Sequence, residues 1–424
     1  MDLNREGANT SQLEQQKNKR VRVEVKALVL ILIHTPFGLE FFDKVAKWRI
    51  AKFYARFNTY LMPAITALAI FLILGSLMVM FADAQAREGV RGVGPAANLL
   101  IPGFNPYLPI TYGLAALVIT IIIHEAGHGI VARVHNIRVD STGIVLFLGI
   151  PVGAFVNIER EELNRATLKQ KSAVLTAGPL NNMILAGACL VAMYVVMSTL
   201  TPLPPDPNAP QFGIMVISVN GGSLAESLGI EANSVIQYVA GQQIMSLDDL
   251  SASLRANLGN TIEISWLNKA GDTIEREVTL PAAVEPGKGT LGVSVTVLAR
   301  DPQQVLDTYK NQFSQNPLAI LLPPTFQQGF VPFSDLMAPK YTSSVFGDNF
   351  APVANMLFWL WFINFNVGIF NALPLGPLDG GQLYGAVIEN RAKSKALAKN
   401  ANMVLTLVMA AIVFAVLVLP YVVF

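Results

Sequence analysis

Residues 110–134 read ITYGLAALVITIIIHEAGHGIVARV, a run that is apolar over most of its length and yet carries two histidines and a glutamate. A helix that crosses a membrane needs about 20 predominantly apolar residues, and this run is long enough. On a helix, His124 and His128 project from one face because they are four residues apart. Glu125 lies beside them, so the run predicts a membrane-spanning helix with a reactive polar face.

The composition of the whole chain favours an integral membrane protein. Of its 424 residues, 52% are hydrophobic and only 14% are charged, whereas a soluble domain has about 25% charged residues. The formal net charge is +1, so no bulk field favours nucleic acid as a partner. The single cysteine, Cys189, excludes both an internal disulfide and a cysteine-rich zinc site. Residues 1–25 are polar and basic, so no signal peptide is expected.

Five segments are long and apolar enough to span the roughly 30 Å of hydrocarbon in a bilayer. They are Tyr60–Phe81, Ile110–Val134, Ser172–Leu200, Pro352–Leu373 and Asn402–Phe424. A shorter apolar run, Ala27–Ile33, cannot span and is expected to be an amphipathic or interfacial element before the basic stretch Lys44–Arg56. The sequence therefore predicts a polytopic α-helical membrane protein with five to six transmembrane helices.

Lysine and arginine predict how these spans are oriented, because loops on the cytoplasmic side are enriched in them. Basic residues crowd three stretches, Lys17–Arg56, Arg160–Lys171 and Arg391–Lys399. If all three are cytoplasmic, the spans alternate consistently, with the N-terminus inside and the C-terminus outside. His124 and His128 then lie near the cytoplasmic end of their helix, and the loop Thr201–Asn349 lies outside. We therefore expect a multi-pass protein of the cell membrane.

The outer loop contains a soluble domain at residues 211–298. It alternates like strands and has room for two short helices, at Ser223–Leu228 and Ser246–Leu258. Its predicted strands are Gly213–Val219, Ser234–Val239, Thr261–Trp266 and Thr273–Leu280. The order of elements and the phrases SVNGGSLAESLGI and VIQYVAGQQIMSLDDL resemble an α+β PDZ domain, and another small α+β domain is the alternative. PDZ domains bind extended peptides by strand addition, so a peptide ligand is expected.

The glycine-rich run Gly143–Val156, which reads GIVLFLGIPVGAFV, predicts a re-entrant β-hairpin in the membrane. Irregular backbone at membrane depth must be shielded by protein, and the alternative is an ordinary cytoplasmic loop. The predicted organisation is a basic cytoplasmic or interfacial segment (1–59), a first transmembrane helix (60–81), a first part of the membrane core (110–200), the inserted domain (211–298), a membrane-surface connection (299–349) and a second part of the core (350–424).

The pattern from His124 to His128 is H-E-x-x-H, which is typical of zinc hydrolases. Such a site needs three protein ligands and an open position for water, so two histidines are insufficient. His34 and His135 are poorly placed in the sequence to be the third ligand. Asp379 is the better candidate for the third ligand, because an acidic residue beside a membrane span is costly and often functional. The alternative is a purely structural role for Asp379 as the cap of a helix.

Asp379 lies in NALPLGPLDGG, residues 371–381, at the end of the fourth span and on the cytoplasmic side in the predicted topology. Pro374 and Pro377 prevent a regular helix there, and Gly380 and Gly381 allow close approach of backbone. We therefore expect an extended, fixed backbone that brings Asp379 to the two histidines.

Together these features resemble the site-2 protease family of intramembrane zinc metalloproteases. The resemblance rests on HEAGH at 124–128, the PDZ-like domain, NALPLGPLDGG, and AGPLNN at 177–182, which matches the family's GPxxN segment. It covers roughly residues 110–390, and the N-terminal part is most similar to archaeal members. The family usually has a proline at the position of Gly376, whereas here the proline stands at 377, which affects the local backbone more than the aspartate.

The resemblance implies one catalytic Zn2+ held by His124, His128 and Asp379, with Glu125 as general base and then proton donor. It also points to Asn371 and Asn182 as groups that hold the substrate backbone or the oxyanion, and interhelical hydrogen bonding is the alternative for both. The implied activity is hydrolysis of peptide bonds within transmembrane segments of single-span proteins in the lipid bilayer, with the PDZ domain screening substrates.

Two other functional classes are weighed against this one. A membrane scaffold with a PDZ domain and a structural metal would normally close its site with four protein ligands, and the sequence offers three. A zinc or proton transporter would place acidic or histidine residues on several spans, whereas here only the two motif-bearing spans carry them.

Overall fold

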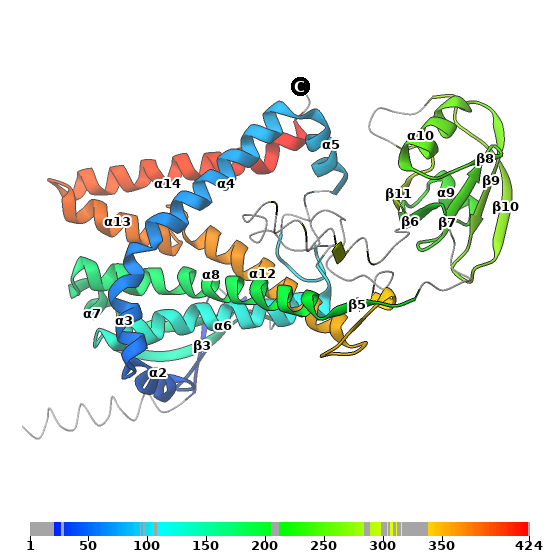
Figure 1. Ribbon diagram of the computed structural model, residues 1–424. Coiled ribbons are helices and arrows are strands. Elements are labelled where there is room, and N and C mark those ends of the chain that lie inside the picture. Colours follow the sequence, from blue (N-terminus) through cyan, green and yellow to red (C-terminus); the bar gives the residue numbers. More distant parts are fainter. Residues whose placement is uncertain are drawn as a thin grey trace, which may run out of the picture. The chain divides into compact units, whose positions relative to one another are not determined.

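The computed structural model describes residues 21–422 except 27–28, 94, 96–98, 106–107, 149, 205–211, 284–288, 298–302, 304–305, 308–310, 312–314 and 316–337 (Figure 1). The chain divides into two compact units. The first consists of Met1–Met193 and Met356–Phe424, and we call it the membrane unit because the long apolar helices lie wholly or largely within it. The second, Tyr194–Asn355, is the inserted unit.

Five helices in the described part of the chain are long and apolar enough to cross a membrane, which confirms five of the five to six predicted spans. They are α4 (Met62–Ala82), α6 (Ile110–Val134), α8 (Leu168–Ser198), α12 (Phe350–Asn371) and α14 (Lys395–Val418), which continues as a 3-10 turn, η6 (Leu419–Tyr421). α6 has the predicted bounds. α14 begins seven residues earlier than predicted, because Ser394 accepts a hydrogen bond from the N–H of Leu397 and caps a polar first turn.

A four-stranded antiparallel sheet joins two distant parts of the membrane unit. Its strands β1 (Arg22–Lys26), β2 (Leu30–Thr35), β3 (Val139–Phe147) and β4 (Ile150–Ile158) pair in that order. The run Ala27–Ile33, expected as an amphipathic or interfacial element, is therefore strand β2 from Leu30 onward, and residues 27–28 lie outside the described part. A local sequence pattern cannot predict this pairing, because Ile33 of β2 is opposite Ile144, which lies far along the chain.

The run Gly143–Val156, apart from residue 149, forms the hairpin of β3 and β4. That this hairpin enters the membrane stays a prediction. A side chain at Gly143 would overlap the ring of Phe155 and the carbonyl oxygen of Ile33, which explains the glycine in a strand interior. β4 is the last strand in the order and packs against α6. Its outer edge therefore carries backbone groups that the sheet does not use.

The described part of the membrane unit also contains shorter helices. They are α2 (Leu39–Ala46), α3 (Arg49–Phe57), the 3-10 turn η1 (Asn58–Tyr60), α5 (Ala84–Val93), α7 (Arg160–Arg165) and α13 (Asp379–Arg391). α2 and α3 pack against α6, and α13 packs against α14. The buried cluster beneath α3 is rich in small side chains, including Ala55, Ala132, Ala173 and Ala177, which let neighbouring helices approach closely.

The inserted unit contains a second sheet whose strands are ordered β10-β9-β7-β6-β11, with β8 paired to β7. The bounds are β6 (Ile214–Val219), β7 (Val235–Val239), β8 (Gln242–Gln243), β9 (Thr261–Leu267), β10 (Thr273–Thr279) and β11 (Val293–Val297), with helices α9 (Leu224–Leu228) and α10 (Leu247–Ala256). The four predicted strands and both helices are present. β8 and β11 were not predicted. A capping box of Ser246 and Asp249 starts α10, and the core includes the fully buried Trp266.

Two short strands, β5 (Leu200–Pro202) and β12 (Tyr341–Ser343), pair with each other in the inserted unit. The predicted third span therefore ends too late, because α8 stops at Ser198 and Leu200 already belongs to a strand. Most of the predicted membrane-surface connection, 299–349, lies outside the described residues.

Candidate metal centre

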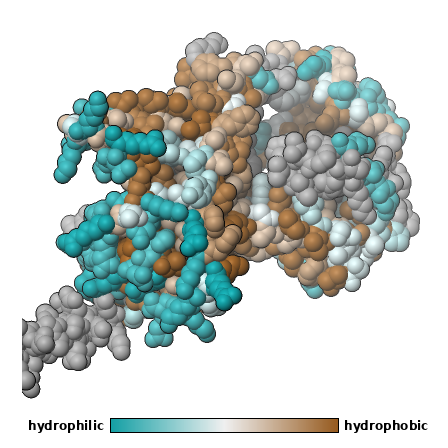
Figure 2. All heavy atoms as spheres, turned by 60° about the vertical axis from the view of Figure 1, so that its left-hand side comes forward, coloured by the Kyte–Doolittle hydropathy of each residue, from teal (hydrophilic) through white to brown (hydrophobic). Residues whose placement is uncertain are grey.

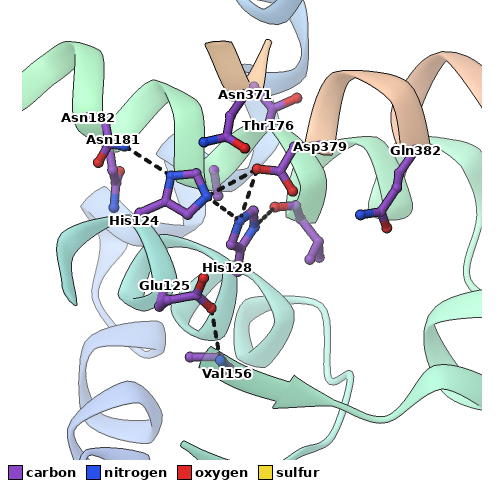
Figure 3. Close-up of polar contacts among 12 residues, drawn as sticks. His124, Glu125, His128, Val156, Thr176, Asn181, Asn182, Asn371, Asp379 and Gln382 are labelled. Atoms are coloured by element: carbon purple, nitrogen blue, oxygen red, sulfur yellow. Dashed lines mark hydrogen bonds and ion pairs between the residues drawn. The ribbon is translucent and has the colours of Figure 1, made fainter. Parts of the chain in front are cut away.

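The structure brings together the two histidines of α6 and an aspartate about 250 residues later, as the sequence predicts (Figure 3). His124 Nε2 lies 3.1 Å from Asp379 Oδ2, and His128 Nε2 lies 3.4 Å from the same oxygen. The two imidazole Nε2 atoms are 3.2 Å apart. The three side chains thus point one candidate ligand atom each at a common centre, and these atoms lie within 4.8 Å of one another.

Two features of the pocket fit a metal ion at this centre. Asp379 Oδ2 is buried and accepts no hydrogen bond among the described residues, so its charge is left for a cation to balance. Gly178 of α8 faces the centre: a Cβ there would lie 2.6 Å from His124 Nε2 and would overlap His128 Nε2. Two imidazoles and one carboxylate match the protein donor set of a zinc hydrolase.

The other nitrogen of each histidine has its own partner, which fixes how the ring is turned. His128 Nδ1 lies 2.7 Å from the carbonyl oxygen of Val174, to which it donates. His124 Nδ1 lies 3.0 Å from the side-chain amide of Asn182. Both bonds leave Nε2 directed at the centre. Metal-binding histidines in proteins are held in the same way.

The orientation of the Asn182 amide follows from the same chemistry. Its Oδ1 is buried without a hydrogen-bond partner among the described residues, while its Nδ2 faces the histidine nitrogen. Rotation by 180° about the Cβ–Cγ bond exchanges the oxygen and the nitrogen of the amide, which are similar in size. Turning the amide over places Oδ1 against His124 Nδ1, where it accepts the N–H that the ring carries when Nε2 binds a metal.

The AGPLNN segment of α8 forms a scaffold of hydrogen bonds behind the centre. The hydroxyl of Tyr54 on α3 donates to Asn181 Oδ1 at 2.7 Å and to Ala177 O at 3.2 Å. Asn181 Nδ2 in turn donates to the carbonyl oxygen of Ile123, directly before the first histidine. Burial raises the pKa of the Tyr54 hydroxyl far above its ordinary value, so it remains a donor. Sequence analysis missed these groups, although the GPxxN segment itself was noted.

Asp379 reaches the centre by a route that differs from the prediction. It is the first residue of α13, so its backbone is helical and not extended. The non-helical stretch with Pro374 and Pro377 comes just before it. A side chain at Gly381 would overlap the carbonyl group of Leu375, so glycine lets the helix start fold tightly against this turn. The helix start aims the aspartate side chain at the histidines.

Glu125 lies beside the centre and bonds to the sheet. Its Oε2 accepts a hydrogen bond from the backbone N–H of Val156 on β4 at 2.8 Å (Figure 3). Because β4 is an edge strand, this N–H is one of the donors that the sheet leaves free. The glutamate thus stands between the two histidines and an exposed strand edge.

The two asparagines named from the resemblance are not equivalent. Asn182 is fully buried and makes an interhelical contact with His124, which was the alternative interpretation. Asn371 is the last residue of α12, and its Nδ2 donates within its own helix to Val367 O at 3.0 Å. A role of either one toward a substrate or an oxyanion stays a prediction.

Comparison with known proteins agrees with this geometry. Residues 112–416 match the family model described as peptidase family M50. An uncharacterized protein of Methanocaldococcus jannaschii is 26% identical over 360 residues, which cover 84% of this chain and 77% of that protein. A Clostridium perfringens protein named "Putative zinc metalloprotease" is 25% identical, covering 66% of this chain and 88% of that protein. One of the same description from Clostridium acetobutylicum is 23% identical, covering 66% and 86%.

Proposed function

The chain belongs to peptidase family M50, the site-2 protease family, and from this premise we propose that it hydrolyses peptide bonds within transmembrane segments of single-span membrane proteins. Membership makes it a zinc metalloprotease with several membrane spans. The observation that carries the narrower proposal is the position of the centre. His124 and His128 lie on α6, a helix long and apolar enough to cross a bilayer, so the reaction takes place beside lipid.

His124, His128 and Asp379 would hold the zinc. When bound, zinc supplies Lewis acidity toward the scissile carbonyl and toward the attacking water. Glu125 accepts the proton of that water and delivers it to the nitrogen of the departing amine, which balances the hydrolysis. Asn182 and the carbonyl of Val174 keep the histidine rings oriented while the proton moves.

β4 would bind the substrate next to the glutamate. A transmembrane substrate must unwind before cleavage, because a helical peptide bond is hydrogen bonded within its own helix. An unwound segment can add to the free edge of β4 as a further strand. Its carbonyl would then take the N–H of Val156 that Glu125 now occupies, and the glutamate would be freed for the water. In this role β3 and β4 would form a re-entrant hairpin at membrane depth.

The inserted unit would be a PDZ domain that screens substrates by binding a peptide. Its sheet ends in β11, an edge strand that packs beside α10. A peptide strand added along β11 would lie next to that helix, which is a common mode of peptide recognition.

The distribution of lysine and arginine supports a cytoplasmic metal centre and an extracytoplasmic PDZ domain. The similarity to the Methanocaldococcus protein over most of this chain supports an archaeal-type member.

The decisive experiment replaces the proposed base while leaving the ligands in place. Glu125→Gln is expected to keep stoichiometric zinc and to lower cleavage of a single-span substrate by at least 100-fold, the effect of a lost general base. Glu161→Gln, on the exposed helix α7, is the matched control and should cleave normally. A non-enzymatic scaffold with a structural metal predicts no zinc-dependent cleavage by either protein. Retained cleavage by Glu125→Gln would overturn the assigned role.

A further inference from the structure

Helix α3 presents three faces, and its first face anchors it inside the membrane unit. Ala51 and Ala55 on this face are buried. Tyr54 donates to Ala177 O, and Asn58, which directly follows the helix, donates to Ala173 O at 2.7 Å. The hydrogen bonds hold α3 against α8, and α3 also packs against α6, so the directions of its other two faces are fixed.

The second face is an exposed apolar stripe. Ile50, Phe53 and Phe57 are 72%, 65% and 46% exposed. They are three and four residues apart and so line one side of the helix. The rings of Phe53 and Phe57 lie 4.7 Å apart, and Trp48, just before the helix, is also exposed. Contiguous aromatic surface of this kind indicates a binding surface when no part of the protein covers it.

The third face is basic. Arg49, Lys52 and Arg56 follow each other at helical spacing and are exposed. α3 contains no acidic residue in its first turn or elsewhere in its sequence RIAKFYARF. Within the described part of the chain, none of the three forms an ion pair with an acidic side chain. The face therefore carries uncompensated positive charge directly beside the apolar stripe.

The position of α3 in the membrane unit indicates what its apolar and basic faces contact. Figure 1 shows α3 running across α6 and α8 at the ends where α6 finishes and α8 begins. If those two helices cross the bilayer, α3 lies along the membrane surface. Figure 2, turned to bring this end forward, shows hydrophilic side chains gathered here next to a broad apolar band. The basic side chains at this end also include Lys169 and Lys171, near the start of α8.

We propose that α3 is an interfacial helix that binds anionic phospholipids. Arg49, Lys52 and Arg56 bind headgroup phosphates, while Ile50 and Phe53, with Phe57, insert between the acyl chains. Helices that lie in the membrane interface combine a basic face with an aromatic and aliphatic one. A second copy of the chain is a poorer occupant, since its own α3 carries the same positive charge. The proposal is independent of the protease activity and of zinc.

The apolar half of the proposal is tested with a fluorescent label at one cysteine. The chain has a single native cysteine, Cys189, so a Cys189→Ala background permits specific labelling. The label is placed at Phe53→Cys, with the exposed position Lys269→Cys in the inserted unit as control, and the full-length protein is reconstituted in phosphatidylcholine–phosphatidylglycerol nanodiscs. We expect a lipid-borne nitroxide to quench the label at 53 several-fold more than the label at 269.

Two outcomes of that experiment would overturn the proposal. Quenching at 53 by a water-soluble quencher alone would place the stripe in water. Protection of position 53 from both quenchers would mean that protein covers the stripe, as in a dimer or a complex. Circular dichroism and thermal unfolding of both labelled proteins confirm that the substitutions leave the fold intact.

The basic half is tested by removing its charge. The variant R49Q/K52Q/R56Q is expected to bind short-chain phosphatidylglycerol roughly 100-fold more weakly in native mass spectrometry, given the contribution of about 1 kcal/mol per basic residue at an anionic surface. R255Q/K269Q/R276Q removes the same charge from exposed positions of the inserted unit and should bind as the unchanged protein does. Equal weakening in both variants would refute a local site. Inorganic phosphate that competes as well as the lipid would show an anion site without lipid specificity.

Discussion

Helices α6 and α8 contribute to the metal centre in different ways. α6 contributes reactive side chains, and all of them lie within the five residues of HEAGH. α8 contributes mainly backbone, through the absent side chain of Gly178 and the carbonyl of Val174. Asp379 completes the centre from a third element, α13. The side chains of α6, which we call the side-chain half, are brought together by helical periodicity alone. The contribution of α8, which we call the backbone half, depends on how α6, α8 and α13 pack.

This difference predicts that the backbone half is as essential as the side-chain half, and Gly178→Ala tests it most severely. Alanine is a better helix former than glycine by about 1 kcal/mol, so α8 itself should not be weakened. The new Cβ would lie against both histidine Nε2 atoms. We therefore expect a folded protein that has lost nearly all of its zinc and its cleavage activity, measured by metal analysis and by substrate assay.

Gly187→Ala provides the matched control on the same helix, because a Cβ at Gly187 meets no atom within 4 Å. It should keep full zinc and activity. If Gly178→Ala also retained zinc, the metal would have to bind away from the point where the three ligand atoms converge, and the site described above would be wrong.

The same contrast explains which parts of the molecule could be predicted from sequence. The spans and the strands β6, β7, β9 and β10 follow from local apolar patterns. The pairing of β2 with β3 does not, since it depends on a partner far along the chain. β11, which pairs with β6, was not predicted either. Its residues lie within the predicted domain, and the alternation of VSVTV at Val293–Val297 is a local strand signal that could have identified it.

The metal ligands could be predicted from the chemistry of their side chains, whereas the groups that position those ligands depend on how the helices pack. His124 and Asp379 could be named because imidazole and carboxylate at a membrane span are conspicuous. Gly178 could not be named as part of the site, since its contribution is the volume it leaves empty. The helical start at Asp379 was also missed, because two prolines dominate the local pattern and the following glycines are poor helix formers.

A smaller effect is expected from Asn182→Leu, which removes a support but no ligand. Leucine fills a similar volume and leaves the Nδ1 of His124 without its partner. Loss of a group that orients a metal ligand typically weakens metal binding by about 10–100-fold. Equilibrium titration with zinc in the presence of a competing chelator measures this change. Asn182→Asp, which keeps an acceptor, should recover part of the affinity.

The result for Asn182 also separates its two interpretations. Zinc affinity that is unchanged while kcat falls would indicate contact with the substrate or the oxyanion, as the family resemblance suggests. Weaker zinc binding with a normal kcat at saturating zinc would indicate support of the histidine alone. Both variants need a thermal unfolding measurement, because the residue is fully buried.

The smallest effect is expected from Tyr54→Phe, which acts on the scaffold one step further from the metal. The substitution removes a hydroxyl that donates to Asn181 Oδ1 and Ala177 O. Leaving buried acceptors without a donor costs about 1–3 kcal/mol of unfolding free energy. Chemical denaturation of the purified protein should show this loss, while zinc affinity changes only a few-fold. A change in zinc affinity as large as that of Asn182→Leu would mean that α3 is part of the centre's support.

The pH dependence of the same pair of proteins provides a second check on Tyr54. Burial raises the pKa of Tyr54 in the folded state above its ordinary value of 10.0. Above about pH 10 the unfolded chain therefore releases a proton that the folded protein retains, so the unfolding free energy falls as pH rises. Tyr54→Phe lacks this contribution, and the difference in stability between the two proteins should shrink with increasing pH above that point. A difference that stays constant would show that the hydroxyl ionises equally well in both states and is not buried behind the metal centre.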